Sequence, residues 1–449
     1  MRSVTAIVAA LAAGCALAPT YHRPEAPVAE RFPAASEGTA AADLGWRAVF
    51  GDPRLQAVIA LALHNNRDLR VAALDVEVAR AQFRIQRWKE LPEIDAIAAV
   101  EASSGTGDAT ATYRVGATVS YELDLFGRIR SLKAAALEAY LASDEARRAV
   151  HLALVSEVVS QYLRERAYGE QRELAERTLA TARQSREMTT RLLEAGQRSD
   201  LDVRSAEAQV HAARAELARI KRLQAQASNS LVLLVGQPLP ADLPLAQPLE
   251  TQAIIADIAA GVPSDVLRRR PDVLAAEHAL RAANANIGAA RAALFPTISL
   301  TGFAGLASTA LSSLLSGGLW TFNPQITLPL FAGGRDRANL DVAKLRNQIE
   351  VARYERAIQV AFREAADALV ARASLDEQLE AQVERAAAEQ RRFEISEIRY
   401  HSGVESYLSV LVAERDLYTT RQQLIELRLA RLTNLADLYR ALGGGWRER

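Results

Sequence analysis

The strongest constraint on the fold of this 449-residue chain is an internal duplication. The segment Arg67-Asp68-Leu69 returns as Pro271-Asp272-Val273, an offset of 204 residues. Later landmarks such as Gly196 and Gly403 are offset by 207 residues, so a short insertion separates two otherwise collinear halves. Units of about 200 residues are too long for solenoid repeats. We therefore expect two copies of one architecture within a single chain.

The N-terminus has the features of an exported lipoprotein. Residues 1–14 carry one positive charge at Arg2 and then small apolar residues, a stretch too short to span a membrane and typical of a signal peptide. The only cysteine, Cys15, follows directly in a segment that resembles a bacterial lipobox, with Ala12 where leucine is more usual. We expect cleavage before Cys15 and a diacylglycerol and palmitoyl lipid on this residue, the alternative being a buried or chance cysteine.

Composition narrows the function classes further. Lys and Arg number 54 and Asp and Glu also number 54, so the net charge is zero and nothing indicates a nucleic-acid partner. With a single cysteine, intrachain disulfides are excluded even in an oxidising periplasm. Ala16 stands after Cys15 in place of aspartate, which by resemblance to bacterial lipoproteins favours sorting to the outer membrane.

Proline-rich segments divide the mature chain. We expect residues 15–46 to form a lipidated, extended strap and residues 237–264 to form an equatorial linker, because prolines recur in both. The first repeat then covers residues 47–236 and the second covers residues 265–449.

Each repeat contains a pair of very long helical segments. Proline is absent from the expected helices, and apolar residues recur at intervals of three, four and seven, which predicts antiparallel coiled coils that turn at glycines. The expected helices cover about 131–195 and 200–235 in the first repeat, and about 337–401 and 406–442 in the second. The first repeat also begins with a shorter helix.

A pair of strands precedes each long helix pair. Apolar and polar residues alternate strictly, which predicts strands with one apolar and one wet face. The expected strands cover about 94–103 and 113–125, then about 297–305 and 319–330. Strands of this length with aromatic residues near their ends suit a membrane barrel, although periodicity alone also allows a soluble sandwich.

Four strands cannot close a barrel, and an open sheet edge is not tolerated in lipid. If these strands enter a membrane, the chain must therefore form an oligomer. Three copies of a duplicated unit would give a pseudo-sixfold tube in which helices continue each strand pair away from the bilayer.

The order and spacing of several short motifs carry a family resemblance. The chain resembles the TolC-like outer-membrane efflux channels, above all their lipid-anchored OprM and NodT branch. The motifs extend over essentially the whole mature sequence: 15–21, 46–50, 62–69, 268–273, 292–296, 330–335 and 438–446.

The resemblance implies a mainly α-helical fold with a membrane β-barrel. Three chains would form twelve strands in the outer membrane of a Gram-negative bacterium and a helical tunnel in the periplasm. The implied function is a passive exit duct for small toxic compounds or drugs, which a periplasmic adaptor and an RND-type inner-membrane pump open. The resemblance implies no cofactor, metal or catalysis.

Other function classes fit the residues less well. A type I protein secretion conduit is the alternative within channels. A structural periplasmic coiled-coil lipoprotein would leave the four strands unexplained. An enzyme is disfavoured, because the six histidines are scattered and no nucleophile motif or phosphate loop occurs.

The helix-pair turns are the expected gate. Leu201 and Leu408 are equivalent residues after the two turns, so in a trimer each could form a hydrophobic ring that resists wetting, although either could instead be a coiled-coil seam residue. By resemblance, Tyr400 matches a position that hydrogen-bonds neighbouring helices in the closed state. Tyr400→Phe is therefore expected to loosen closure.

An acidic constriction is less well supported by the residues. The family often has acidic residues just beyond the second turn, where this chain has Ser409 and Val412. Asp202 and Asp416 could take over part of that role, or could be solvated surface charges.

The turns are also the expected adaptor contacts, and ordinary turn chemistry is compatible with that role. The candidate contact residues are Gly196, Arg198, Ser199, Gly403 and Glu405.

Overall fold

The computed structural model describes residues 17–29, 32, 39–40, 44–103, 110–254, 258–259 and 269–444. The predicted signal peptide and Cys15 lie outside the described residues. The described chain is mainly helical with one four-stranded antiparallel sheet, which confirms the predicted fold class at this level.

The chain divides into two compact units that cut across the two repeats. The first unit comprises residues up to 27, 73–146 and 272–357, and the second comprises 28–72, 147–271 and 358–449. Each unit therefore contains segments of both repeats.

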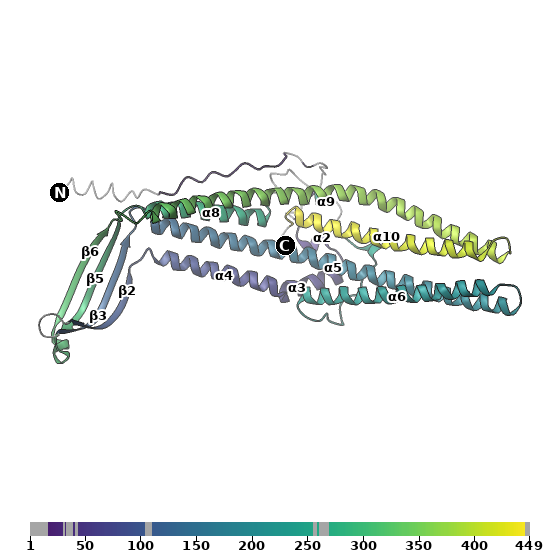
Figure 1. Ribbon diagram of the computed structural model, residues 1–449, viewed down its shortest axis with the longest axis horizontal. Coiled ribbons are helices and arrows are strands. Elements are labelled where there is room, and N and C mark those ends of the chain that lie inside the picture. The colour runs from purple at the N-terminus through teal and green to yellow at the C-terminus, as the bar shows by residue number, and fades with distance from the viewer. Residues whose placement is uncertain are drawn as a thin grey trace. The chain divides into compact units, whose positions relative to one another are not determined.

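The first unit contains the four-stranded sheet (Figure 1). Its strands are β2 (Glu93–Ser103), β3 (Thr110–Leu123), β5 (Thr297–Ser308) and β6 (Gly318–Thr327), in the order β2-β3-β5-β6. Each repeat supplies one hairpin, and β3 and β5 join the two hairpins.

Several strand ends differ from the prediction, and β3 covers residues 110–123 where about 113–125 was expected. β6 ends at Thr327, so residues 328–330 lie outside the strand, and β5 extends to Ser308. The expected loop after β5 contains a short 3-10 helix, η3 (Leu311–Ser316). Six residues without alternating polarity do not distinguish a loop from one turn of helix.

The register gives the sheet one apolar face. Ile94 lies opposite Val119, which lies opposite Gly302, which lies opposite Phe322, so these residues share a face. Large apolar side chains of this face are exposed: Ile94, Val100, Val115, Trp320, Phe322 and Ile326. The opposite face carries mainly polar residues.

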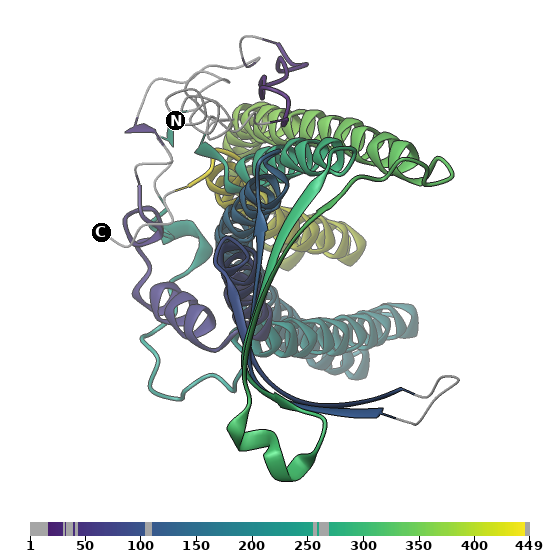
Figure 2. The ribbon, with the colours of Figure 1, turned by 90° about the vertical axis from the view of Figure 1, so that its left-hand side faces the viewer.

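The strands bend along their length (Figure 2). At the junction of the two hairpins, Gly116 lies opposite Gly305. A Cβ added to Gly116 would lie 2.5 Å from the carbonyl oxygen of Ala304, so only glycine permits this close approach of the two strands.

The outer edges of the sheet are open. Within the described part of the chain, β2 pairs only with β3 and β6 pairs only with β5. The edge strands are 11 and 10 residues long and present unpaired backbone groups.

The long helices follow the predicted duplication. α5 (Arg128–Glu194) and α9 (Arg335–His401) have 67 residues each and extend through both units. At 1.5 Å per residue, each is about 100 Å long. α6 (Asp200–Val235) and α10 (Tyr407–Ala441) return along them.

Shorter helices precede the strands. The first repeat has α2 (Trp46–Val49), α3 (Pro53–Asn65) and α4 (Arg67–Trp88), so the expected single helix is broken at Asn66. The second repeat has α8 (Pro271–Ala292).

Hydrogen bonds between the long helices show that each pair is antiparallel. Gln161 donates to the Ala227 carbonyl at 2.9 Å, and Arg172 donates to Gln224 at 3.0 Å. In the second pair, the side chain of Gln382 donates to the Thr420 carbonyl at 3.0 Å.

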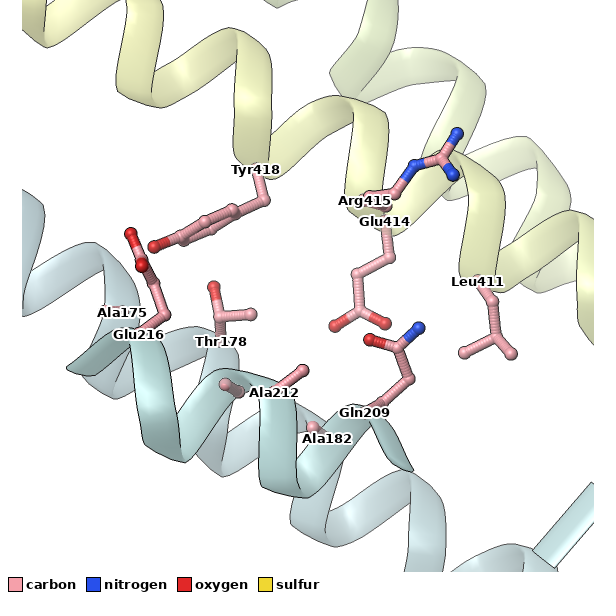
Figure 3. A pocket seen from close by; sticks show the side chains of 11 residues that line it. Ala175, Thr178, Ala182, Gln209, Ala212, Glu216, Leu411, Glu414, Arg415 and Tyr418 are labelled. Carbon is pink, nitrogen blue, oxygen red and sulfur yellow. The ribbon is translucent and has the colours of Figure 1, made fainter. Parts of the chain in front are cut away.

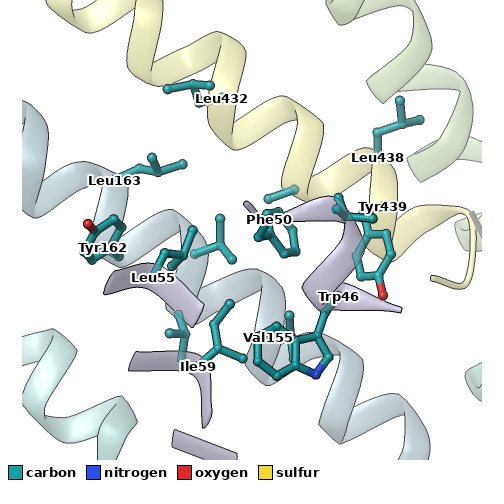
Figure 4. Packing of buried hydrophobic residues seen from close by; sticks show 14 of the residues in the cluster. Trp46, Phe50, Leu55, Ile59, Val155, Tyr162, Leu163, Leu432, Leu438 and Tyr439 are labelled. Carbon is teal, nitrogen blue, oxygen red and sulfur yellow. The ribbon is translucent and has the colours of Figure 1, made fainter. Parts of the chain in front are cut away.

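The core of the second unit packs α2 and α3 against the long helices (Figure 4). Trp46, Phe50 and Tyr439 are almost completely buried, and the rings of Phe50 and Tyr439 meet edge-on at 5.6 Å. Asp52 is fully buried and begins α3 by accepting the backbone N–H of Arg54 at 2.8 Å. Its carboxylate also accepts the hydroxyl of Tyr162 at 2.8 Å, which fixes α3 to α5.

The strap and the linker contact each other through two very short strands. β1 (Thr39–Ala40) and β4 (Ile258–Ala259) pair in parallel. The sequence did not predict them, because two residues carry no periodic signal.

The two repeats close by equivalent hydrogen bonds. Asn66, before α4, donates its side-chain amide to the Leu234 carbonyl at the end of α6 at 2.9 Å. Arg270, before α8, donates to the Ala441 carbonyl at the end of α10, also at 2.9 Å. Arg270 makes a further ion pair of 2.9 Å with Glu364 of α9.

Candidate functional site

The two helix-pair turns have the same backbone geometry. Gly196 and Gly403 adopt φ angles of +70° and +74°. In the first turn, the N–H groups of Gly196 and Gln197 donate to carbonyls of the last turn of α5, and the second turn repeats both bonds at the equivalent positions. This is the pattern with which a left-handed residue ends a helix.

Leu201 and Leu408 lie in the first turns of α6 and α10. Their side chains are 74% and 68% exposed, so neither is buried in a seam of the described chain. Both are therefore available to contact other surfaces at the turns.

Tyr400 lies in a small buried cluster beside the second turn. Its ring is 5.4 Å from the ring of Tyr407, and Ala206 of α6 belongs to the same cluster. The guanidinium of Arg198, in the first turn, lies 4.5 Å from the centre of the Tyr400 ring. Arg198 and Tyr400 thus connect the two turns through a cation–π contact.

Tyr407 is a functional candidate that sequence reasoning missed. Its hydroxyl forms a hydrogen bond with the hydroxyl of Ser185, which joins α10 to α5. Burial raises the pKa of Tyr407. A tyrosine at the first position of a helix carries no signal that distinguishes this role from surface exposure.

The two candidate gate aspartates are both engaged in local contacts. Asp202 forms a capping box with Ser199, in which its carboxylate accepts the Ser199 N–H at 3.1 Å. Asp416 accepts hydrogen bonds from Arg392 at 2.9 Å and Arg415 at 3.1 Å. The hydrogen bond from Arg392, followed by that from Arg415, lowers the pKa of Asp416. Neither carboxylate is an isolated charge.

The second turn has weaker local contacts than the first. Glu405 pairs with Arg399 at 3.2 Å. Ser406 precedes α10 without a capping hydrogen bond from its side chain, and its hydroxyl lies 3.3 Å from that of Ser409.

A cavity of about 360 Å³ lies between α5, α6 and α10 (Figure 3). Its lining is mainly apolar, with alanines from α5 and α6 and Leu411 from α10. The carboxylates of Glu414 and Glu216 and the phenol of Tyr418 also line it. Burial, and then the charge of Glu397, raises the pKa of Glu414.

The strap lies along one stripe of α8 in the first unit. Arg291 donates to the Leu17 carbonyl at 3.1 Å, and Asn284 donates to the Pro19 carbonyl at 2.8 Å. Between them, a Cβ added to Gly288 would lie 2.7 Å from the side chain of Ala18. The strap therefore lies against the helix backbone here.

Glu277 holds the other end of the strap. Its carboxylate accepts Arg23 at 2.6 Å, Arg281 at 2.7 Å and the Tyr21 hydroxyl at 3.3 Å. Burial alone would raise the pKa of Glu277, but the hydrogen bonds from the two arginines lower it below its ordinary value. The strap runs antiparallel to α8, so Leu17 lies at the end of the helix that leads into β5.

Among the described residues, neither a metal-binding group nor a membrane-spanning helix is found. No group of three or more histidine, cysteine, aspartate or glutamate residues in the described ranges could hold a metal ion. Among the described helices, none is both long and apolar enough to cross a membrane.

Duplicated helix pairs joined to a sheet with an exposed apolar face define a class of channel-like membrane proteins. The family model described as "Outer membrane efflux protein" matches residues 58–237 and 262–444. The chain belongs to this family.

Curated relatives agree with this assignment. The chain is 47% identical to a probable efflux pump outer membrane protein, TtgC of Pseudomonas putida, over 99% of this chain and 95% of that protein. It is 43% identical to the cation efflux system protein CusC of Escherichia coli, over 98% of each chain.

A solved structure has the same fold. The open state of the MtrE outer membrane channel of Neisseria gonorrhoeae superposes with a TM-score of 0.89 at 43% identity, covering 96% of this chain and 98% of that one. The predicted family, fold class and outer-membrane efflux function are thereby confirmed.

Proposed function

We propose that three copies of this chain form the exit duct of a tripartite efflux pump. The four-stranded sheet supports the proposal most strongly, because it exposes a large apolar face and leaves both edges unpaired within the described chain. In lipid, unpaired edges are too costly to persist, so neighbouring copies must pair them. Three four-stranded sheets supply twelve strands, enough to leave room for an aqueous lumen.

Substitutions at two neighbouring residues of β6 test this proposal. Phe322 lies on the apolar face and Asn323 on the opposite face. A charged residue on a lipid face near the bilayer midplane costs about 2–4 kcal/mol. We expect Phe322→Arg to reduce the amount of protein in the outer membrane and its conductance in planar bilayers, and Asn323→Arg to leave the amount unchanged. Equal amounts of both variants, with normal pores, would contradict the proposal.

The duct has a lipid anchor at its N-terminus. The contact of Leu17 with Arg291 supports this, because it holds the first described residue of the strap at the end of α8 that leads into β5. The lipid would then enter the bilayer that holds the strands. Incorporation of labelled palmitate into the wild type, and its loss in Cys15→Ser, is the expected result.

The duct closes at the helix turns, where an adaptor and the pump open it. The exposure of Leu201 and Leu408 supports their role as hydrophobic rings in the trimer. The turn residues Gly196, Arg198, Ser199, Gly403 and Glu405 are the proposed adaptor contacts. Asp202 and Asp416 contribute through their local contacts rather than as an acidic ring.

The cargo comprises small toxic compounds, and no chemical step is assigned to the chain. Relatives named for toluene, solvent, antibiotic and cation efflux support this class. Deletion of the gene followed by a susceptibility panel should sensitise the cell to compounds of at least one of these kinds. Unchanged susceptibility to every compound would contradict the assignment.

A further inference from the structure

Small side chains create the cavity of about 360 Å³ between α5, α6 and α10. α5 contributes Ala175, Thr178 and Ala182, which recur at intervals of three and four residues and therefore share one face of the helix. The neighbouring part of α6 contributes Ala212 and Ala213. The three helices thus border a space within the range of about 300–1,000 Å³ that is typical of pockets for small organic ligands.

The duplication shows that these small residues are particular to the first helix pair. In α9, the positions that correspond to the three residues of α5 carry long polar side chains: Gln382, Arg385 and Glu389. Gln382 crosses to α10 and donates to the carbonyl of Thr420, which corresponds to Ala213. Long side chains therefore occupy in the second pair the positions that the first pair leaves small.

One carboxylate that faces the cavity has no counterion. Glu414 of α10 points into the space towards α6, whereas the neighbouring Arg415 points away (Figure 3). Arg415 instead donates to Asp416 at 3.1 Å. Within the described part of the chain, the partly buried Glu414 forms no hydrogen bond or ion pair, and the charged group that affects its ionisation is a second carboxylate, Glu397. The charge of Glu414 is therefore available to a cation.

The other carboxylate of the cavity is already compensated. Glu216 of α6 accepts two hydrogen bonds of 2.7 Å from Arg219 and one of 2.9 Å from Gln422. The hydrogen bond from Arg219 is the main reason why the pKa of Glu216 lies below its usual value. Tyr418, one turn after Glu414 on α10, extends towards Glu216 (Figure 3). An aromatic ring and a carboxylate without a counterion thus lie side by side on one face of α10.

We propose that this cavity binds an amphipathic organic monocation, in which an ammonium group is attached to a compact apolar body. The ammonium group contacts the carboxylate of Glu414, and the neighbouring ring of Tyr418 favours a cation in the same place. The apolar body lies against the alanines of α5 and α6. Burial of that body supplies most of the binding free energy, and the carboxylate selects the charge of the ligand.

The lining disfavours other classes of ligand. An anion would meet the carboxylates of Glu414 and Glu216. A metal ion such as Ca²⁺ needs six or more oxygen ligands, as a rule of about that size, and no group of three or more acidic, histidine or cysteine residues among the described ones could hold a metal. A hydrophilic polycation would gain nothing from the apolar walls.

A bound cation would contact both helix pairs of the chain. α5 and α6 form the first pair, and α10 belongs to the second. A ligand that touches all three helices stabilises their packing, because it binds the folded arrangement and not the unfolded chain. The cavity is formed by one chain, so this proposal does not depend on the proposed trimer.

Three naphthalene derivatives that differ in charge test the site. Naphthylmethylamine is a cation at neutral pH, naphthylmethanol is neutral and naphthylacetate is an anion. Isothermal titration calorimetry of the purified full chain, in one detergent, measures the affinity of each. We expect the cation to bind about tenfold or more tightly than the alcohol, because hydrogen bonds to charged groups are the stronger ones, and we expect no binding of the anion.

Two substitutions of glutamate locate the charge that binds the cation. Glu414→Gln removes the charge and keeps the size of the side chain, so the affinity for the cation should fall about tenfold or more, to that of the alcohol. The matched control is Glu207→Gln at the equivalent residue of the first repeat, where the carboxylate pairs with Arg204 at 2.9 Å. This control should bind the cation like the wild type. Partition of the probe into detergent is the same for all variants.

A third variant tests whether the ligand occupies the cavity. Ala213→Leu places a larger side chain in the lining, so it should abolish binding of both the cation and the alcohol while circular dichroism shows unchanged helical content. If Ala213→Leu does not fold, the comparison of Glu414→Gln with Glu207→Gln decides. Equal affinities of the wild type for cation and alcohol, or an unchanged affinity of Glu414→Gln for the cation, would overturn the proposal. Absence of cation binding to the wild type would also overturn it.

Discussion

In both repeats, a side chain donates a hydrogen bond to a backbone carbonyl at the end of the second long helix, but the donor residue differs between the repeats. Asn66 donates a neutral amide to the Leu234 carbonyl, whereas Arg270 donates to the Ala441 carbonyl and also pairs with Glu364. The residue equivalent to Glu364 is Glu157, which has no arginine at the position of Asn66 to pair with it. Duplication has therefore preserved the backbone geometry, while the side-chain chemistry has diverged.

The turns follow the same rule. Gly196 and Gly403 have nearly identical φ angles, yet Ser199 forms a capping box and Ser406 does not cap its helix with its side chain. Each difference between equivalent residues can be tested by a matched pair of substitutions.

The largest effect is expected at the links that close the repeats. Arg270→Ala removes the donor to the Ala441 carbonyl and leaves Glu364 with its longer contact to Arg440 at 3.7 Å, which together should cost about 3 kcal/mol of unfolding free energy. Asn66→Ala loses one hydrogen bond and a helix cap, about 1 kcal/mol. Thermal denaturation of the purified protein measures both, and equal shifts would show that the ion pair adds nothing.

The next largest effect is expected at two glycines that have similar φ angles but different surroundings, where substitution by alanine should reduce stability to different extents. Gly236→Ala adds a Cβ 2.6 Å from the Asn65 carbonyl oxygen at φ +77°, and we expect a loss of about 2 kcal/mol. At Gly196, φ is +70° and the space is open, so only the backbone cost of about 1 kcal/mol applies. A larger loss for Gly196→Ala than for Gly236→Ala would reverse the expected order.

Closure at the turns should depend more on the Tyr407 hydroxyl than on that of Tyr400. Tyr407→Phe removes the hydrogen bond to Ser185, about 1 kcal/mol, and should increase leakage of a large antibiotic in a strain without the pump. Ser185→Ala should have the same effect without adding to it. Tyr400→Phe keeps the ring that Arg198 contacts, so we expect a smaller increase in leakage. Leakage equal to that of the wild type would show that the Tyr400 hydroxyl does not contribute to closure.

The smallest effect concerns Glu414 and its equivalent, Glu207. The raised pKa of Glu414 means that its ionisation in the folded state is penalised. The penalty is absent at pH values below the pKa of the unfolded chain and develops as pH rises through the raised pKa of the folded state. Glu414→Gln should therefore raise the melting temperature at pH 7 and have little effect near pH 4.

Glu207→Gln is the matched control. Glu207 pairs with Arg204 at 2.9 Å on the surface, and exposed ion pairs contribute little to stability. A pH-dependent gain for Glu207→Gln as large as that for Glu414→Gln would show that burial of Glu414 is not the cause.

Most of the fold could be predicted from the sequence, because in a long helix or strand many residues repeat the same periodic pattern of apolar and polar side chains. The absence of proline over α5 and α9 and the alternation in β3 left few other possibilities. Short features could not be predicted: β1 and β4 have two residues each, and the break between α3 and α4 depends on the hydrogen bond from Asn66 to Leu234.

The two helix turns were predicted from the sequence, but their side-chain contacts were not, and the role of the turns as gate and adaptor site stays a prediction. A glycine between two long helical segments predicts a turn with a positive φ angle, and Gly196 and Gly403 both adopt one. The contact between Arg198 and Tyr400 and the hydrogen bond between Ser185 and Tyr407 join segments about 200 residues apart. Only the packing of the four long helices brings such residues together.

Within the described residues, one chain leaves both outer edges of its sheet unpaired, and neighbouring copies must pair them in the membrane. Native mass spectrometry of the protein extracted from outer membranes in mild detergent measures whether they do. We predict a single species containing three chains, each with its lipid. A stable single chain under the same conditions would show that the sheet edges do not need a neighbouring copy.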